Sequence, residues 1–367
     1  MAVVAWCLVA APARVAGAGG GPQGPGGPAS TGGPGGPTRA GGPAAGDSYL
    51  TRLAAAVRGR LDAARQSHVA RLVPPVPVTP RWKPQKLGSL DLGAPLVAVA
   101  AADLDGDGKA ELYLVTAREV IAVGAAGKLR ELGRVAFTGE PAVPAPRDVV
   151  GTAVVDGTAV IAGVSAWAKD LRIEWRGKAL SARHGAGGFR LCADRVQLAS
   201  GRNHFREGGA ALFGARCRDD LVDGSGAPLR IRGELATTGA LSVTVARCAP
   251  PAGPAAAGAP ASAAATAECQ PAGAYQVRDV GIAFEIADVD RDGTPDAVVS
   301  SASAPGDTDS VRVIALGTPG ARPAYKKSFN GGVAGIAVAD SDGDGVPEVI
   351  AVVRLSGATR VDLWRLD

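Results

Sequence analysis

The chain is 367 residues long, and 46% of its residues are hydrophobic, so it is too apolar to be disordered throughout. Charged residues make up 20% and the formal net charge is +4, which is too small to indicate nucleic-acid binding. Glycine (52 residues) and proline (27 residues) are abundant while aromatic residues are scarce at 4%. The buried surface must therefore come from many small strands of Val, Ala and Leu.

The N-terminal residues resemble a secretory signal peptide, which we place at residues 1–18. Residues 2–13 form a short apolar run, and Ala16 and Ala18 provide a small-x-small cleavage pattern. The run is too short to span a bilayer, which takes about 20 apolar residues. We therefore expect export to the periplasm, the cell envelope or the extracellular space, with a cytoplasmic protein as the alternative.

A linker and a helix are expected to follow. Residues 19–46 are almost wholly Gly, Pro, Ala, Ser and Thr without a strict three-residue period, which excludes collagen and predicts a flexible linker. Residues 47–80 predict an amphipathic helix, with apolar residues at three- and four-residue spacing, and then a proline-rich spacer. The arginines from Arg52 to Arg71 leave contact with an anionic membrane as an alternative. The absence of Trp and Phe on the apolar side favours packing on the main domain or a partner.

The most informative pattern is an acidic loop that occurs three times, each time between two apolar strands. Each copy has Asp at positions 1, 3 and 5, Gly at position 6, and Asp or Glu at position 9. The carboxylates of the three copies are Asp103, Asp105, Asp107 and Glu111; Asp288, Asp290, Asp292 and Asp296; and Asp340, Asp342, Asp344 and Glu348. Four carboxylates within nine residues repel one another unless a cation neutralises them, so the pattern predicts a metal site.

Calcium fits this pattern better than magnesium does. Calcium takes about six to eight oxygen ligands at about 2.3–2.6 Å, whereas magnesium demands strict octahedral geometry and keeps its waters. The backbone carbonyls at position 7, those of Lys109, Thr294 and Val346, are expected to complete each site. An EF-hand is excluded because position 12 is apolar in all three copies and lies in a β-branched run. We expect about three structural Ca²⁺ ions.

The motif Asp-x-Asp-x-Asp-Gly-x-x-Asp/Glu between short apolar strands resembles the FG-GAP/VCBS repeat family, the integrin-α type of β-propeller. The resemblance covers about residues 88–137 and 280–367, and the middle of the chain departs from it. It implies four-stranded blades around a central axis. It also implies that calcium is held in the loop between the first two strands of a blade, by the loop residues named above.

The spacing of the loops predicts the number of blades. The second and third loops start 52 residues apart, which suits a propeller blade. The same step from the first loop reaches Asp156 and then Gly208-Gly209, where turns without the acidic ladder are expected. An Ala/Pro/Gly-rich insertion at residues 249–275 accounts for the longer distance to the next loop.

We therefore expect an all-β fold in residues 81–367, a β-propeller of about five four-stranded blades. Six blades are the alternative, if residues 185–250 contain two degenerate units. The last blade has only three predicted strands, near 333–339, 348–354 and 358–365. The segment Lys86–Leu92 is expected to supply the fourth strand and so close the ring.

The cysteines agree with an exported protein. With Cys7 set aside, four remain, in three alternative pairings, and no closely spaced pair suggests a zinc site. We expect Cys192–Cys217 and Cys248–Cys269, each closing a short loop and stabilising the fold by about 3 kcal/mol. The alternative is four small buried side chains in a reducing compartment.

No catalytic motif is present, and we assign no catalytic residue. His184 and His204, with arginines nearby at Arg190, Arg202 and Arg206, leave a propeller-scaffold lyase or hydrolase acting on polysaccharide as one alternative. A lectin is another, because tryptophans can stack on sugars; the candidates are Trp82, Trp167, Trp175 and Trp364. The favoured interpretation is an exported calcium-binding propeller that serves as a binding or structural module for an envelope protein or glycan.

Overall fold

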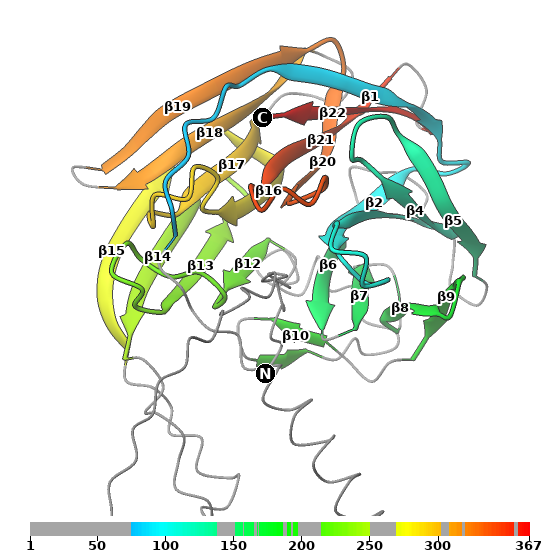
Figure 1. Cartoon of the computed structure of the whole chain (residues 1–367), viewed down its shortest axis with the longest axis horizontal. Coiled ribbons are helices and arrows are strands. Elements are labelled where there is room, and N and C mark those ends of the chain that lie inside the picture. The colour runs from blue at the N-terminus through cyan, green and yellow to red at the C-terminus, as the bar shows by residue number, and fades with distance from the viewer. Residues whose placement is uncertain are drawn as a thin grey trace, which may run out of the picture. The chain divides into compact units, whose positions relative to one another are not determined.

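The structure, a computed structural model, describes residues 75–137, 151–156, 158–164, 167, 169–185, 189–191, 194–196, 214–249, 269–301, 308–317, 320–355 and 359–367. The regular structure in these residues is all β-strand, in five four-stranded antiparallel sheets and one two-stranded hairpin. The five sheets are the blades of a β-propeller arranged in a ring (Figure 1). The predicted fold class and the blade number of five are confirmed. A search of these residues for a helix able to cross a membrane finds none.

The blades follow one another in chain order. Blade 1 contains β2 (Leu96–Ala102), β3 (Glu111–Thr116), β4 (Glu119–Gly124) and β5 (Arg130–Ala136). Blade 2 contains β6 (Gly151–Asp156), β7 (Ala159–Val164), β8 (Leu171–Arg176) and β9 (Ala179–His184). Blade 3 contains β12 (Ala215–Arg218), β13 (Leu229–Leu235), β14 (Leu241–Cys248) and β15 (Cys269–Val277). Blade 4 contains β16 (Val280–Ala287), β17 (Asp296–Ser301), β18 (Asp309–Gly317) and β19 (Gly320–Phe329).

Blade 5 is assembled from both ends of the domain. It contains β20 (Gly332–Ala339), β21 (Glu348–Arg354), β22 (Arg360–Leu366) and β1 (Pro84–Asp91). β1 is antiparallel to β22, with Pro84 opposite Leu366 and Asp91 opposite Arg360. The prediction that a strand near 86–92 closes the ring is thus confirmed. β1 covers the edge that β22 would otherwise expose and becomes the outer strand of the blade.

The hydrophobic core lies between consecutive blades. Separate clusters of buried side chains join blades 1 and 2, 3 and 4, 4 and 5, and 5 and 1. Since both faces of a blade pack on neighbours, the second strands β3 and β21 are buried along their whole length apart from the last residue of β21. The outermost strand β19 is mostly exposed and carries charged residues. This explains why the second strands appear in the sequence as unbroken apolar runs.

The predicted position of the first turn of blade 3 is wrong. The sequence spacing places this turn at Gly208-Gly209, but the first two strands of the blade are β12 and β13, and the loop between them is 219–228. A hairpin of β10 (Phe189–Leu191) and β11 (Asp194–Val196) lies in the chain between blades 2 and 3. This additional hairpin displaces blade 3 from the regular 52-residue step.

The predicted insertion at 249–275 is too long by its last residues. Residues from Cys269 onward form β15, which pairs along its length with β14. Their Ala/Gly/Pro-rich composition concealed a strand at the outer edge of a blade, where little burial is required. The predicted disulfide Cys248–Cys269 is present and joins the ends of these two strands. Cys217 is also disulfide-bonded.

Several predictions concern residues outside the described part of the chain. These are the signal peptide at 1–18, the linker at 19–46, the helix within 47–72, Cys192, and His204 with Arg202 and Arg206. Residues 75–83 of the predicted spacer have no regular structure, as their prolines lead one to expect. Trp82, in this segment, stacks on Tyr325 of β19 with ring centroids 4.6 Å apart.

Candidate metal-binding loops

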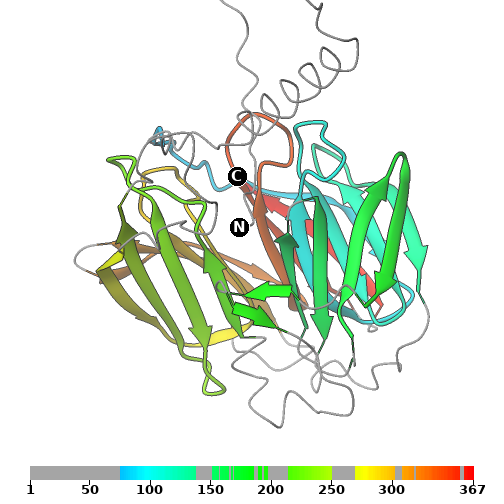
Figure 2. The ribbon, with the colours of Figure 1, turned by 90° about the horizontal axis from the view of Figure 1, so that it is seen from below.

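The three acidic loops occupy equivalent positions in three blades. Each joins the first strand of a blade to the second: 103–110 in blade 1, 288–295 in blade 4 and 340–347 in blade 5. All three lie at the same end of the propeller, at the top of Figure 2. This is the connection at which the resemblance to the FG-GAP/VCBS repeats implies calcium.

Carboxylate oxygens converge in each loop. One oxygen from every member of a cluster lies within 4.8 Å of the others, and the clusters are Asp103, Asp105, Asp107 and Glu111; Asp340, Asp342, Asp344 and Glu348; and Asp288, Asp290 and Asp296. Eleven of the twelve predicted carboxylates are therefore brought together. The exception is Asp292, whose carboxylate accepts a hydrogen bond from the amide of Thr294 (2.6 Å).

The first Asp of each loop fixes the turn. The two carboxylate oxygens of Asp103 accept hydrogen bonds from the amides of Gly106 (2.7 Å) and Gly108 (3.0 Å). The equivalent bonds recur in the other loops, from Asp292 and Gly293 to Asp288, and from Gly343, Asp344 and Gly345 to Asp340. The glycine at position 6 has a φ between 82° and 87° in the three loops. Side chains rarely adopt this left-handed conformation, which explains why the position is Gly.

The last acid of each loop is buried beneath it. Glu111, Asp296 and Glu348 are 3%, 4% and 3% exposed. Each accepts a hydrogen bond from the amide at the second position of its own loop, with distances of 3.2, 2.9 and 2.8 Å. Glu111 also accepts one from the Tyr113 hydroxyl (2.9 Å), so the acid is oriented from below by the second strand.

Burial and mutual repulsion oppose ionisation of these acids. Burial, aided by the neighbouring Asp charges, raises the pKa of Glu111 to about 7, of Asp296 to about 8 and of Glu348 to about 7. The same causes raise the pKa of Asp288 to about 6. Without a cation the loops would hold protons near neutral pH, and a divalent cation would displace them.

The donor set fits a hard cation that prefers oxygen. All clustered groups are carboxylates, with neither nitrogen nor sulfur among them, as suits calcium better than a transition metal. At position 7, the amides of Lys109, Thr294 and Val346 each donate to the third Asp of their loop. The predicted ligation by their carbonyls stays a prediction.

Blade 3 contains a fourth loop of the same kind that the sequence reasoning missed. Its segment Asp223-Gly-Ser225-Gly226-Ala-Pro228 has the spacing of Asp342-Gly-Asp-Gly-Val-Pro347. Gly226 has φ 83°, like the position-6 glycines. The first and last acids are replaced by Leu221 and Leu229, so the acidic ladder is lost. The repeated Gly-x-Gly-x-Pro was the signal that could have revealed the loop.

An arginine lies beside Asp223, the one acid that remains at a motif position of this loop. The guanidinium Nε of Arg247 lies 2.6 Å from a carboxylate oxygen of Asp223. Although burial opposes ionisation, hydrogen bonds from Ser225 and Ala227 and the charge of Arg247 hold the pKa of Asp223 below its usual value. At the equivalent position of blade 4, burial and the charge of Asp292 raise the pKa of Asp290. The comparison indicates that a basic side chain offsets the acidic charge of the blade 3 loop. In blade 5, Arg365 does so in part, because its Nη1 lies 3.1 Å from a carboxylate oxygen of Asp342.

Substitution of Arg247 tests this difference. Arg247→Ala is expected to lower the melting temperature by roughly 2–4 °C, or about 1 kcal/mol, because one partner of the pair is exposed. The loss should be the same with calcium and with EDTA, since no carboxylate cluster is found in this loop among the described residues. Arg232→Ala, which removes an exposed pair with Glu234 in the same blade, is the control and should cost less. A loss that calcium restores would contradict the assignment.

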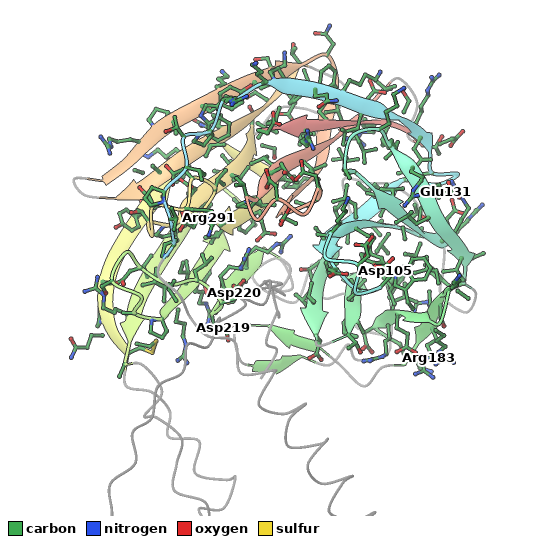
Figure 3. All side chains as sticks on the ribbon, in the orientation of Figure 1. Asp105, Glu131, Arg183, Asp219, Asp220 and Arg291 are labelled. Atoms are coloured by element: carbon green, nitrogen blue, oxygen red, sulfur yellow. A yellow bond between two sulfur atoms is a disulfide. The ribbon has the colours of Figure 1, made fainter. Side chains whose placement is uncertain are left out.

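The loops contact one another in an arc around the ring. The amide of Ala110 in blade 1 donates to the carbonyl of Asp340 in blade 5 (2.8 Å). Nη1 of Arg291 in blade 4 donates to the carbonyl of Gly345 in blade 5 (2.9 Å); Figure 3 labels Arg291 and, on the blade 1 loop, Asp105. Gly293 lies so close to the backbone of blade 3 at Gly224 that a side chain would clash.

The other predicted functional residues lie elsewhere. His184 ends β9 and packs edge-on against Phe137 and Trp167. Both of its ring nitrogens are buried and find no hydrogen-bond partner among the residues that the structure describes. This arrangement does not favour a role as a general acid or base. Trp175 donates to the Tyr113 hydroxyl (2.8 Å) and packs between blades 1 and 2. Trp364 lines a pocket.

The comparisons with known proteins leave the family open. No family model and no curated protein matches the chain. Among solved structures, the PQQ-bound aldose sugar dehydrogenase of Streptomyces coelicolor is similar, with TM-score 0.34 and 13% identity, over 80% of this chain and 100% of that one. The S. cerevisiae core factor matches with TM-score 0.31 and 9% identity, over 76% of this chain and 48% of that one. Likenesses this distant give no argument about function.

Proposed function

We propose that this protein is an exported, calcium-stabilised β-propeller of the FG-GAP/VCBS type that serves as a binding module at the cell envelope. The observation that carries the proposal is the convergence of carboxylate oxygens within 4.8 Å in three loops at equivalent positions of three blades. Calcium offsets the repulsion within each loop and is structural. The partner is a protein or a glycan bound by the remaining surface.

Two further observations support export. The disulfide Cys248–Cys269 is of the kind that persists in oxidising compartments. The N-terminal residues have an apolar run followed by a small-x-small pattern, as in the later parts of a signal peptide. The FG-GAP/VCBS type is supported by the motif and by its place between the first two strands of a blade.

Calcium titration of EDTA-dialysed protein by isothermal calorimetry tests the metal sites. We expect three bound ions per chain, because three loops have the complete motif. Asp105→Asn, Asp290→Asn and Asp342→Asn should each remove one ion, since each removes one charged oxygen ligand from one loop and leaves the size of the side chain unchanged.

The matched control is Asp219→Asn, at an exposed acid in the blade 3 loop that belongs to none of the clusters. This variant should still bind three ions. The absence of calcium binding to the unaltered protein, or three ions bound by each of the loop variants, would reject the metal proposal.

A further inference from the structure

A pocket of about 470 Å³ lies between the outer parts of blades 4 and 5. Its walls are formed by the end of β19 and the residue after it on one side, and by the end of β21 and by β22 on the other. β21 begins at a metal loop, whereas the pocket includes Val353 and Leu355 at its far end. The pocket therefore faces the end of the propeller opposite the metal loops. Its volume is in the range that holds a small ligand.

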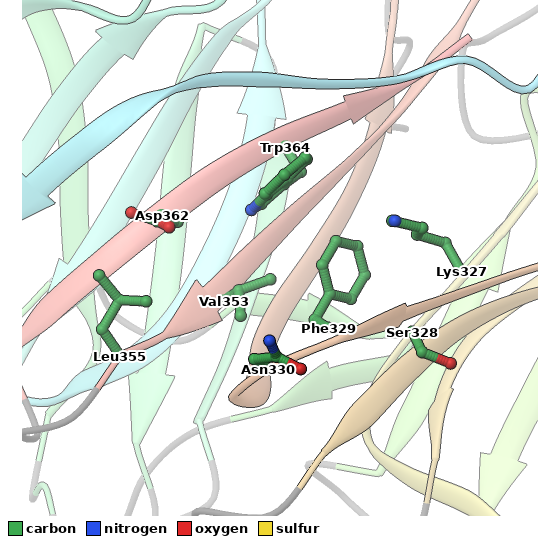
Figure 4. A pocket seen from close by; sticks show the side chains of 8 residues that line it. All are labelled: Lys327, Ser328, Phe329, Asn330, Val353, Leu355, Asp362 and Trp364. Atoms are coloured by element: carbon green, nitrogen blue, oxygen red, sulfur yellow. The ribbon is translucent and has the colours of Figure 1, made fainter.

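The floor of the pocket is aromatic and aliphatic. The rings of Phe329 and Trp364 lie side by side, with centroids 5.6 Å apart and planes inclined by 58° (Figure 4). Val353 and Leu355 extend the apolar surface. Phe329 is buried, while Trp364 is partly exposed and presents its ring to the pocket. The electron-rich face of an indole attracts polarised C–H groups, such as those on the apolar face of a sugar ring.

Polar groups surround this floor. Asp362 lies at one side of the pocket and Lys327 at the other, with Asn330 between them; Ser328, on the side of Lys327, also lines the pocket (Figure 4). Asp362 is 6% exposed and is held by a hydrogen bond from the Ser89 hydroxyl (2.6 Å) and an ion pair with Lys86 (2.6 Å). An aromatic floor with a few oriented donors and acceptors is what a sugar with several hydroxyl groups requires.

The charges of the pocket are not balanced. Lys86 already neutralises Asp362. The ammonium of Lys327 lies 5.9 Å from the centroids of both Phe329 and Trp364, and no carboxylate of the described residues lies within ion-pair distance of it. A cation held over two rings and otherwise unpaired is available to an anionic group on a ligand that stacks on those rings.

We propose that this pocket binds a glycan through a sugar residue that bears a carboxylate, such as a uronic acid. The sugar ring stacks on Trp364, its carboxylate pairs with Lys327, and its hydroxyls bond to Asp362 and Asn330. This deepens the proposed binding role by naming its ligand class. It does not depend on the metal loops, which lie at the other end of the blades.

The test begins with the full chain on an array of neutral and carboxylated glycans. Titration calorimetry then compares a glucuronate-containing tetrasaccharide with its carboxyl-reduced counterpart, for the unaltered protein and its variants. We expect the carboxylated sugar to bind at least tenfold more tightly. Lys327→Gln should abolish that preference, and Trp364→Leu should weaken both sugars at least tenfold. Lys326→Gln, the exposed neighbour on the same strand, should bind like the unaltered protein.

Two outcomes would overturn the inference: no carboxylated glycan binds, or Lys327→Gln keeps the full preference. Because Lys327 is at the surface, this variant remains informative even if Trp364→Leu fails to fold. Calcium stoichiometry is measured on the same samples. If the protein binds three calcium ions but no glycan, the pocket proposal alone is rejected. If it binds the glycan but no calcium, the metal-site proposal alone is rejected.

Discussion

Removal of calcium with EDTA is expected to lower the melting temperature by roughly 16–32 °C. A site that is occupied at about 100 times its dissociation constant contributes about 2.7 kcal/mol, so three sites contribute about 8 kcal/mol. Each kcal/mol moves the melting temperature of a large domain by roughly 2–4 °C. The effect is large because the loops lie in three of five blades and contact one another around the ring. Scanning calorimetry with excess calcium and with EDTA measures it.

The pH dependence provides the control for this experiment. In the metal-free protein, the pKa values of Glu111, Asp296 and Glu348 are raised to between about 7 and 8. A raised pKa in the folded state gives stability that is complete below the unfolded value, near 4, and is lost as the pH rises through 7 to 8. The EDTA-treated protein should therefore melt higher at pH 5 than at pH 8. The gain from calcium should grow over the same interval, and a larger gain at pH 5 would contradict the assignment.

Loss of the closing strand β1 is expected to have the second large effect. A variant with residues 84–91 replaced by a Gly/Ser segment of equal length leaves blade 5 with three strands. It loses the buried side chain of Leu87, which alone is worth about 2–5 kcal/mol. It also loses the ladder with β22 and the partners of the buried Asp362. We expect cooperative unfolding to be lost, or to shift to much lower urea concentration, and β22 to be exposed as an edge that associates.

Urea unfolding and size-exclusion chromatography measure these changes. Leu87→Ala is the graded comparison and should lower stability by about 2–5 kcal/mol while the protein stays monomeric and cooperative. A Gly/Ser variant that unfolds at the urea concentration of the unaltered protein and elutes as a monomer would show that β1 does not hold the ring closed.

The parts of the fold that could be predicted from the sequence are those that a single short segment is enough to identify. The acidic loops are local, so the ligands from Asp103 to Glu111 could be recognised without knowledge of the rest of the chain. Ring closure followed from counting, because the last blade lacked a strand and residues 86–92 were unassigned. Both predictions rest on a unit that recurs in the chain, the acidic loop in one case and the four-stranded blade in the other. Such recurrence makes a chance match to the motif improbable.

The parts that were missed depend on substitutions or on long-range neighbours. The blade 3 loop escaped because Leu221 and Leu229 replace two acids, and its compensating charge, Arg247, comes from a strand that is distant in sequence. The pocket escaped because Phe329 and Trp364 belong to different blades. Their approach depends on how the blades pack, and no local pattern encodes it.

The pairing of β1 with β22 also sets the order in which the protein can fold. Pro84 meets Leu366 about 280 residues later in the chain, and at about 5–20 residues per second the ribosome needs tens of seconds to make that stretch. Until then blade 5 is incomplete, and the other four blades form an open arc. The closed ring can therefore appear only after synthesis of the domain ends.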